Sequence, residues 1–125
     1  MKTRLTYVGN FLELGYDDHP DAPSLASLRW RRKSANKEEV VAYLRGGVTL
    51  VFSPGRDFDV LDDSKVAGSS SIATDGVYVW PRTLAYYVET YDVELPAAFE
   101  SHMERNRWDA PEVVDKASLE IPRYS

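Results

Sequence analysis

The stretch from Thr74 to Trp108 constrains the fold of this chain more than any other part of its sequence. It opens with Asp75-Gly76, a pair that tolerates the positive φ angles of a tight type I′ turn, so we expect an antiparallel hairpin around it. Pro81 ends the second strand because proline cannot donate to a strand ladder, and its fixed φ suits the first turn of a helix. A hairpin that leads into helices is typical of an α+β domain.

Two helices are predicted to follow this hairpin. The first has an apolar face whose members recur at the spacing i, i+3, i+4 and i+7: Leu84, Tyr87, Val88 and Tyr91. The second begins at Pro96, and its Phe99 and Met103 lie one turn apart on a common face. Because an apolar helical face must leave water, we expect both helices to pack on the sheet.

The upstream half of the chain predicts a further helix and a second hairpin. Apolar spacing over residues 36–46 indicates an amphipathic helix that stops at Gly46-Gly47. The β-branched run Val48 to Phe52 predicts a buried strand, and Asp57 to Val60 alternates polar with apolar residues, as a strand with one wet face does. We expect these two strands to pair through the turn between them. A shorter helix is expected at 24–28, capped by Ser24.

Together these elements predict one α+β domain over residues 1–125, with an antiparallel β-sheet covered on one face by about three helices. Residues 109–125 carry scattered apolar residues between prolines, so this tail either docks as a short helix or strand or stays mobile.

Composition excludes several classes of function. The chain has no cysteine, which removes disulfides, thiolate metal sites and cysteine nucleophiles. It has neither a long apolar run nor a secretory leader, so we expect a cytoplasmic protein with no membrane partner. A formal net charge of −5 makes nucleic acid an unfavourable partner and suits a basic protein better.

Four aspartates form the most acidic segment of the sequence: Asp57, Asp59, Asp62 and Asp63. They do not fit a calcium loop, because Leu61 stands where an oxygen ligand belongs and Gly68 where the bidentate glutamate is needed. We therefore predict no metal site and no cofactor. The cluster is interpreted as a solvated strand edge or, in its functional version, as a charged patch that binds a protein partner.

The aromatic residues of the opening stretch suggest anchors for such a partner. More aromatics are present than one interior can hold, and Trp and Tyr are favoured at the centres of interfaces. We expect Trp80 and Trp108, beside the aspartates, to anchor this chain to its partner, which is either another protein or a second copy of the chain. The leading hypothesis is a noncatalytic protein-binding domain.

Two other hypotheses remain open. A small hydrolase or transferase would use His19 or His102, the only histidines, because histidine titrates near neutral pH. An RNA-binding module would be centred on Trp30 and the basic residues around it: Arg29, Arg31, Arg32 and Lys33.

The segment from Thr74 to Met103 also resembles a known family. It reads T-D-G-x-Y-x-W-P, then L-x-Y-Y-V-x-x-Y, then V-x-L-P-x-x-F-x-x-H-M. This pattern is similar to that of a family of small, uncharacterised bacterial proteins, which resemble in size and style the immunity proteins of polymorphic toxin systems. The resemblance implies an inhibitor that binds and blocks a toxin domain, and it assigns no functional residue.

Overall fold

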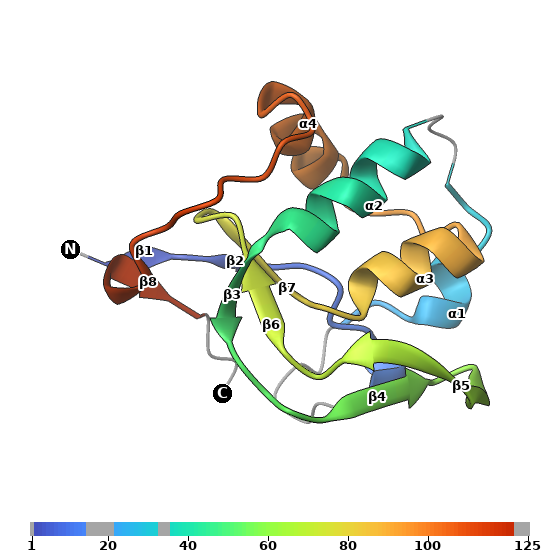
Figure 1. Ribbon diagram of the computed structural model, residues 1–125. Helices are drawn as coiled ribbons and strands as arrows, with labels where there is room; N and C mark the ends of the chain where they lie inside the picture. Colours follow the sequence, from blue (N-terminus) through green and yellow to red (C-terminus); the bar gives the residue numbers. More distant parts are fainter. Residues whose placement is uncertain (1, 15–21, 33–35, 122–125) are drawn as a thin grey trace.

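A computed structural model of the protein describes residues 2–14, 22–32 and 36–121, and its centre is a four-stranded sheet in the order β2-β7-β6-β3 (Figure 1). Strands β6 (Ile72–Thr74) and β7 (Tyr78–Pro81) pair antiparallel, which confirms the predicted hairpin. Strand β3 (Val48–Val51) is antiparallel to β6, whereas β2 (Thr6–Tyr7) runs parallel to β7. The α+β prediction is confirmed, with a sheet that is mixed because its N-terminal strand joins in parallel.

The loop of this hairpin is longer than the predicted two-residue turn. The register pairs Thr74 with Val79, so four residues, 75–78, lie between the paired positions. The carboxylate of Asp75 accepts hydrogen bonds from the backbone amides of Val77 and Tyr78, at 2.9 and 2.7 Å. Asp75 thus organises the loop through its side chain, as aspartates in turns commonly do.

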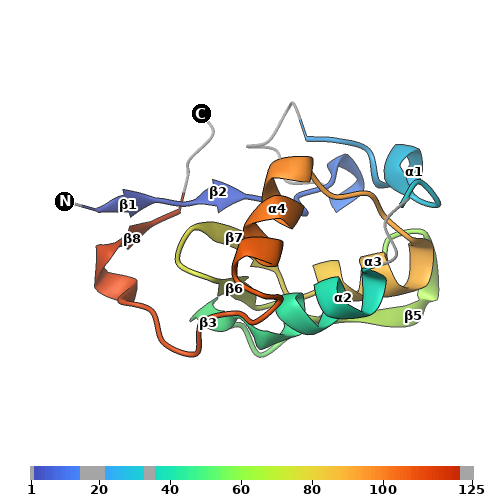
Figure 2. The same cartoon turned by 90° about the horizontal axis from the view of Figure 1, so that it is seen from above.

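Three predicted helices are present: α2 (Lys37–Gly46), α3 (Leu84–Tyr91) and α4 (Ala97–Arg105). Both views show α2 and α3 side by side, and α2 and α4 cover the face of the sheet from which Trp80 projects (Figure 1, Figure 2). The short α1 (Leu25–Leu28) lies where the sequence predicts it. Over the described ranges, no helix has the length and apolar character needed to cross a membrane.

The N-terminus of α1 is capped by a residue that the sequence did not indicate. Ser24 does not cap the helix with its own side chain. Instead, the carboxylate of Glu13, in the 3-10 helix η1 (Leu12–Leu14), accepts from the amides of Leu25 and Ala26 at 2.7 and 2.8 Å and from the Ser24 hydroxyl at 2.8 Å. Burial alone would raise the pKa of Glu13, but these hydrogen bonds outweigh it and lower the pKa below its ordinary value.

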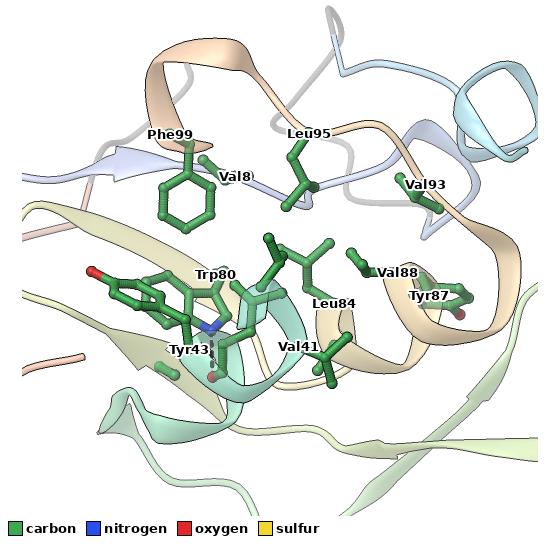
Figure 3. Close-up of a cluster of buried hydrophobic side chains, with 14 of the residues drawn as sticks. Val8, Val41, Tyr43, Trp80, Leu84, Tyr87, Val88, Val93, Leu95 and Phe99 are labelled. Atoms are coloured by element: carbon green, nitrogen blue, oxygen red, sulfur yellow. Dashed lines mark hydrogen bonds between the residues drawn. The ribbon is translucent and has the colours of Figure 1, made fainter. Parts of the chain in front are cut away.

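Trp80 is at the centre of the hydrophobic core and is fully buried. Its indole nitrogen donates to the carbonyl of Leu44 at 3.1 Å, and its ring packs against those of Tyr43 and Phe99, which also contact each other (Figure 3). A Cβ on Gly47 would come within 2.5 Å of the Trp80 ring, so only glycine fits there. The prediction of Trp80 as a surface anchor is therefore wrong: β7 is an inner strand, and two helices cover this face.

The second predicted hairpin forms with different partners. Strand β4 (Arg56–Asp59) pairs antiparallel with β5 (Asp62–Ser69), while the expected partner of β4, β3, pairs with β6. The segment between β3 and β4 leaves the sheet at Ser53, whose amide and carbonyl both bond to the Ser71 hydroxyl, at 2.9 and 3.1 Å. The β4–β5 hairpin therefore stands apart from the central sheet and packs against α3.

The C-terminal tail docks on the start of the chain. After the 3-10 helix η2 (Lys116–Ser118), strand β8 (Leu119–Glu120) pairs in parallel with β1 (Thr3–Arg4). The amide of Leu5 donates to the carbonyl of Glu120 at 2.8 Å. Of the two alternatives for the tail, the described part takes the docked one.

Candidate functional site

The outer face of the β4–β5 hairpin exposes large apolar side chains. Among the described residues, eight large hydrophobic side chains are exposed, and five of them lie between Val51 and Val66. Phe58 on β4 and Val66 on β5 are direct cross-strand partners, with 59% and 45% of their surfaces exposed. We call this pair the hairpin patch. A cross-strand aromatic–β-branched pair stabilises a hairpin only modestly, by about 0.2–1 kcal/mol, and a grouping of exposed apolar side chains fits a surface that another molecule covers.

The inner face of the same hairpin carries a buried carboxylate. Asp59 is 1% exposed, and its side chain accepts hydrogen bonds from the hydroxyls of Tyr86 and Tyr91 at 2.7 and 2.5 Å. It also accepts from the amide of Leu61 at 2.7 Å. The two phenols fasten the end of β4 to α3, while the Leu61 amide bonds to Asp59 within the turn between β4 and β5.

The two faces of β4 are therefore reversed relative to the sequence prediction. The alternation over residues 57–60 is real, but Asp59 points to α3 and Phe58 points to solvent. Asp57 is half-buried and accepts from the Ser70 hydroxyl at 2.9 Å. The assignment of Asp59 to an exposed acidic patch is wrong, because the phenols of α3 supply the polar partners that solvent would otherwise provide.

The tyrosines around Asp59 are held in their neutral form. Burial and the hydrogen bond to Asp59 raise the pKa of Tyr86 to about 12. The hydrogen bond to Asp59 and, after it, burial also raise the pKa of Tyr91. Both phenols therefore keep their protons, and remain donors to Asp59, at an alkaline pH at which an ordinary tyrosine ionises.

The remaining aspartates lie at the start of β5. Asp62 accepts from the hydroxyl and amide of Ser64, which lower its pKa, and it lies 3.8 Å from the ammonium of Lys65. Asp63 is exposed. These two carboxylates are the accessible part of the predicted acidic cluster. Across the described parts of the chain, no three histidine, aspartate or glutamate side chains gather as metal ligands would.

The other tryptophans lie elsewhere. Trp108 follows α4, packs against the core and is only partly accessible, so its role as an anchor stays a prediction. Trp30 is 61% exposed, with its ring 5.6 Å from that of Tyr91. The basic run beside Trp30 does not form one surface, because the Arg32 side chain is 2% exposed and pairs with Glu100 at 2.7 Å. Lys33 lies outside the described residues.

A second buried aspartate organises the only described histidine. The Nε2 atom of His102 lies 3.1 Å from Oδ2 of Asp75, which also accepts the Tyr43 hydroxyl at 2.6 Å. The amide of Asn106 donates to the same Tyr43 hydroxyl at 2.9 Å. From the sequence, Asp75 was predicted only as a turn residue, so this cluster was missed. The available signal of a buried aspartate was its position just before a buried strand. His19 lies outside the described residues.

This His102 cluster is closed rather than open to a substrate. Burial and the hydrogen bond to Asp75 raise the pKa of Tyr43, so its hydroxyl remains a donor to Asp75 even at alkaline pH. Asp75 is 4% exposed, and its second oxygen is used by the loop amides. The cluster joins the β6–β7 loop to α2 and α4, and the contacts of these described residues place no serine or threonine hydroxyl beside His102.

Comparison with protein-family models, with curated proteins and with solved structures found no significant match to this chain. The resemblance to small bacterial proteins of the immunity type therefore stays a prediction. Function has to be argued from the geometry of the chain itself.

Proposed function

We propose that this protein is a noncatalytic protein-binding domain, and that the hairpin patch is the centre of its binding surface. The observation that carries this proposal is the pairing of exposed Phe58 and Val66 on a hairpin whose opposite face is locked to α3 by Asp59. A rigid, preorganised apolar surface binds with little loss of conformational entropy, which favours affinity. An apolar centre with a polar rim is the usual anatomy of an interface.

The partner on this surface is a basic protein. The chain carries a net charge of −5, and Asp62 and Asp63 lie on the same hairpin as the patch. Because Arg56 and Lys65 are also exposed there, the preference for a basic partner rests on the charge of the whole chain. Carboxylates at the rim speed the encounter with a basic surface, while the apolar centre slows release. A toxin domain with a basic active site would fit this chemistry, which makes an immunity-like inhibitor acting in the cytoplasm our most specific version of the proposal.

The His102–Asp75 pair is the one observation that favours a small hydrolase or transferase instead. In our proposal this pair is structural, because Nε2 faces the buried Asp75 and the His102 side chain is only 15% exposed. Replacing His102 with Asn separates the two hypotheses: it is expected to leave partner binding within about twofold, since His102 lies on α4 and not on the β4–β5 hairpin. A hydrolytic activity that His102→Asn abolishes would support the enzyme.

Photocrosslinking in the native host tests the proposal. Phe58 is replaced with the photoreactive p-benzoylphenylalanine, and in a matched control Val113, which is 85% exposed, is replaced in the same way. We expect one basic protein to be crosslinked from position 58 and not from position 113. A protein crosslinked equally from both positions, or none from position 58, would contradict the assignment. A toxin encoded in the neighbouring gene as the crosslinked partner would support the immunity version.

A further inference from the structure

A pocket of about 550 Å³ lies away from the hairpin patch, between the segment that leaves β2, helix α1 and the connection from α3 to α4. Its walls are mainly apolar, with Val8, Phe11, Leu28 and Leu95 among the lining residues. A volume of this size is typical of sites that enclose a small organic molecule. The pocket therefore has the dimensions of a ligand site and not of a packing defect.

One lining residue has a polar side chain without a partner. Asn10 is 6% exposed, and both its amide nitrogen Nδ2 and its oxygen Oδ1 are buried without a hydrogen bond. An unpaired buried amide destabilises a fold, since both atoms lose their bonds to water and gain none. Such a group calls for an occupant that supplies one donor and one acceptor.

The backbone around Asn10 is fixed before any ligand arrives. Gly9 has a φ of +82°, and a Cβ at this position would lie 2.8 Å from two carbons of Leu84, so the path of the chain into Asn10 admits only glycine. On the opposite wall, the carboxylate of Glu13 holds the N-terminus of α1, whose Leu28 lines the pocket. The site is thus preformed, as small-molecule pockets usually are.

We propose that this pocket binds a neutral, largely apolar small molecule that carries a carboxamide-like group. Rotation of the Asn10 side chain lets Nδ2 donate to the ligand's carbonyl while Oδ1 accepts from its N–H, so both unpaired atoms are satisfied at once. Of the described residues that line the pocket, only Glu94 is charged. A negative rim of this kind disfavours anions, which separates a carboxamide from the carboxylate of the same shape.

The test uses two probes of nearly identical shape, 2-naphthamide and 2-naphthoate. The chain has three asparagines, Asn10, Asn36 and Asn106, and no glutamine, so only three side-chain amide pairs appear in a ¹H–¹⁵N NMR spectrum. Titration with 2-naphthamide is expected to shift the Asn10 pair in a saturable way and to leave the other two in place. Binding of 2-naphthoate is expected to be at least about tenfold weaker, because its carboxylate cannot donate to Oδ1 of Asn10 and is repelled by Glu94.

Asn10→Leu provides the variant that completes the test. Leucine keeps the approximate volume and removes the unpaired amide, so the variant is expected to be at least as stable as the wild type. It should bind 2-naphthamide at least about tenfold more weakly than the wild type does, because both hydrogen bonds to the carboxamide are lost, whereas Asn36→Ala should keep the wild-type affinity. The proposal is overturned if the Asn10 signals stay in place at every concentration of 2-naphthamide up to its solubility limit. That is the result expected if a bound water satisfies the Asn10 amide. It is equally overturned if Asn10→Leu binds 2-naphthamide as tightly as the wild type does.

Discussion

Two hairpins of this protein are fastened to helices by the same device, a buried aspartate that accepts phenolic hydroxyls. In the β6–β7 hairpin, Asp75 accepts the hydroxyl of Tyr43 from α2. In the β4–β5 hairpin, Asp59 accepts the hydroxyls of Tyr86 and Tyr91 from α3. The two hairpins are alike in how they are held.

They differ in what covers their other side. In β7, neighbouring residues point to opposite faces of the sheet, and both Val79 and Trp80 are fully buried. In the β4–β5 hairpin, Phe58 and Val66 face solvent on the side away from α3. Both faces of the β6–β7 hairpin are therefore buried in the fold. The β4–β5 hairpin is attached to its helix in the same way, but its other face presents apolar side chains to solvent. This difference, rather than the acidity of the segment, points to the β4–β5 hairpin as the binding element.

The largest expected difference between the hairpins is in the cost of truncating their aromatic residues. Trp80→Ala is expected to lower the free energy of unfolding by about 3–5 kcal/mol, because it opens a cavity and leaves the Leu44 carbonyl without its donor. Phe58→Ala should change it by less than about 0.5 kcal/mol, since the ring is already exposed. Urea unfolding of the two variants measures both values. Similar losses would show that the hairpin patch is packed in solution.

A smaller difference is expected between the two aspartates. Asp75→Asn should cost about 2–3 kcal/mol, because Asp75 accepts from Tyr43, Val77 and Tyr78 and also faces His102. Asp59→Asn should cost about 1–2 kcal/mol and raise hydrogen exchange in β4 and β5 alone. If Asp59→Asn instead raised exchange throughout the central sheet, the hairpin would not be a separate unit.

Alkaline pH is expected to weaken the Asp59 attachment. The folded pKa of Tyr86 is raised to about 12, above the value of about 10 in an unfolded chain, so the folded state keeps the phenol proton longer. The stability that this contributes is fully present below about pH 10 and is lost as the pH rises toward 12. Melting temperatures from pH 8 to 11.5 should therefore fall less steeply in Tyr86→Phe than in the wild type. Parallel curves would contradict the role of this hydroxyl.

The smallest expected effect on stability belongs to Phe58→Asp. The side chain is 59% exposed, so the free energy of unfolding should change by no more than about 0.5 kcal/mol. A melting curve that coincides with that of Val113→Asp, a matched exposed position, would confirm this. A large loss of stability would mean that Phe58 is already covered in the isolated chain, and the hairpin patch would then not be available to a partner.

The sequence predicted local structure well where spacing alone decides it. The faces of α3 and α4 followed from the helical period, and the β6–β7 hairpin followed from the Asp75-Gly76 turn and Pro81. Strand β5 was missed because its sequence, DDSKVAGS, is polar and has no period-two apolar pattern. Because β5 was not predicted, the sequence could not identify it as the pairing partner of β4.

The site was harder to predict because both of its faces depend on tertiary contacts. Alternation in β4 showed that Asp59 and Phe58 point to opposite sides, but it could not show which side is buried. The phenols on α3 decide this, since they turn a carboxylate that water would normally solvate into an interior acceptor. For the same reason, neutralising all four aspartates together is a poor test of binding: it also removes the Asp59 attachment.

The affinity of the crosslinked partner for purified variants tests the central claim most directly. Isothermal titration of the wild type, Phe58→Asp and Val113→Asp with this partner compares the hairpin patch with a more exposed position that lies outside it. A charge at the centre of an apolar interface is expected to weaken binding by about 100-fold, and Val113→Asp should leave it within about threefold. Equal affinity of Phe58→Asp and the wild type would contradict the assignment of the β4–β5 hairpin as the binding surface.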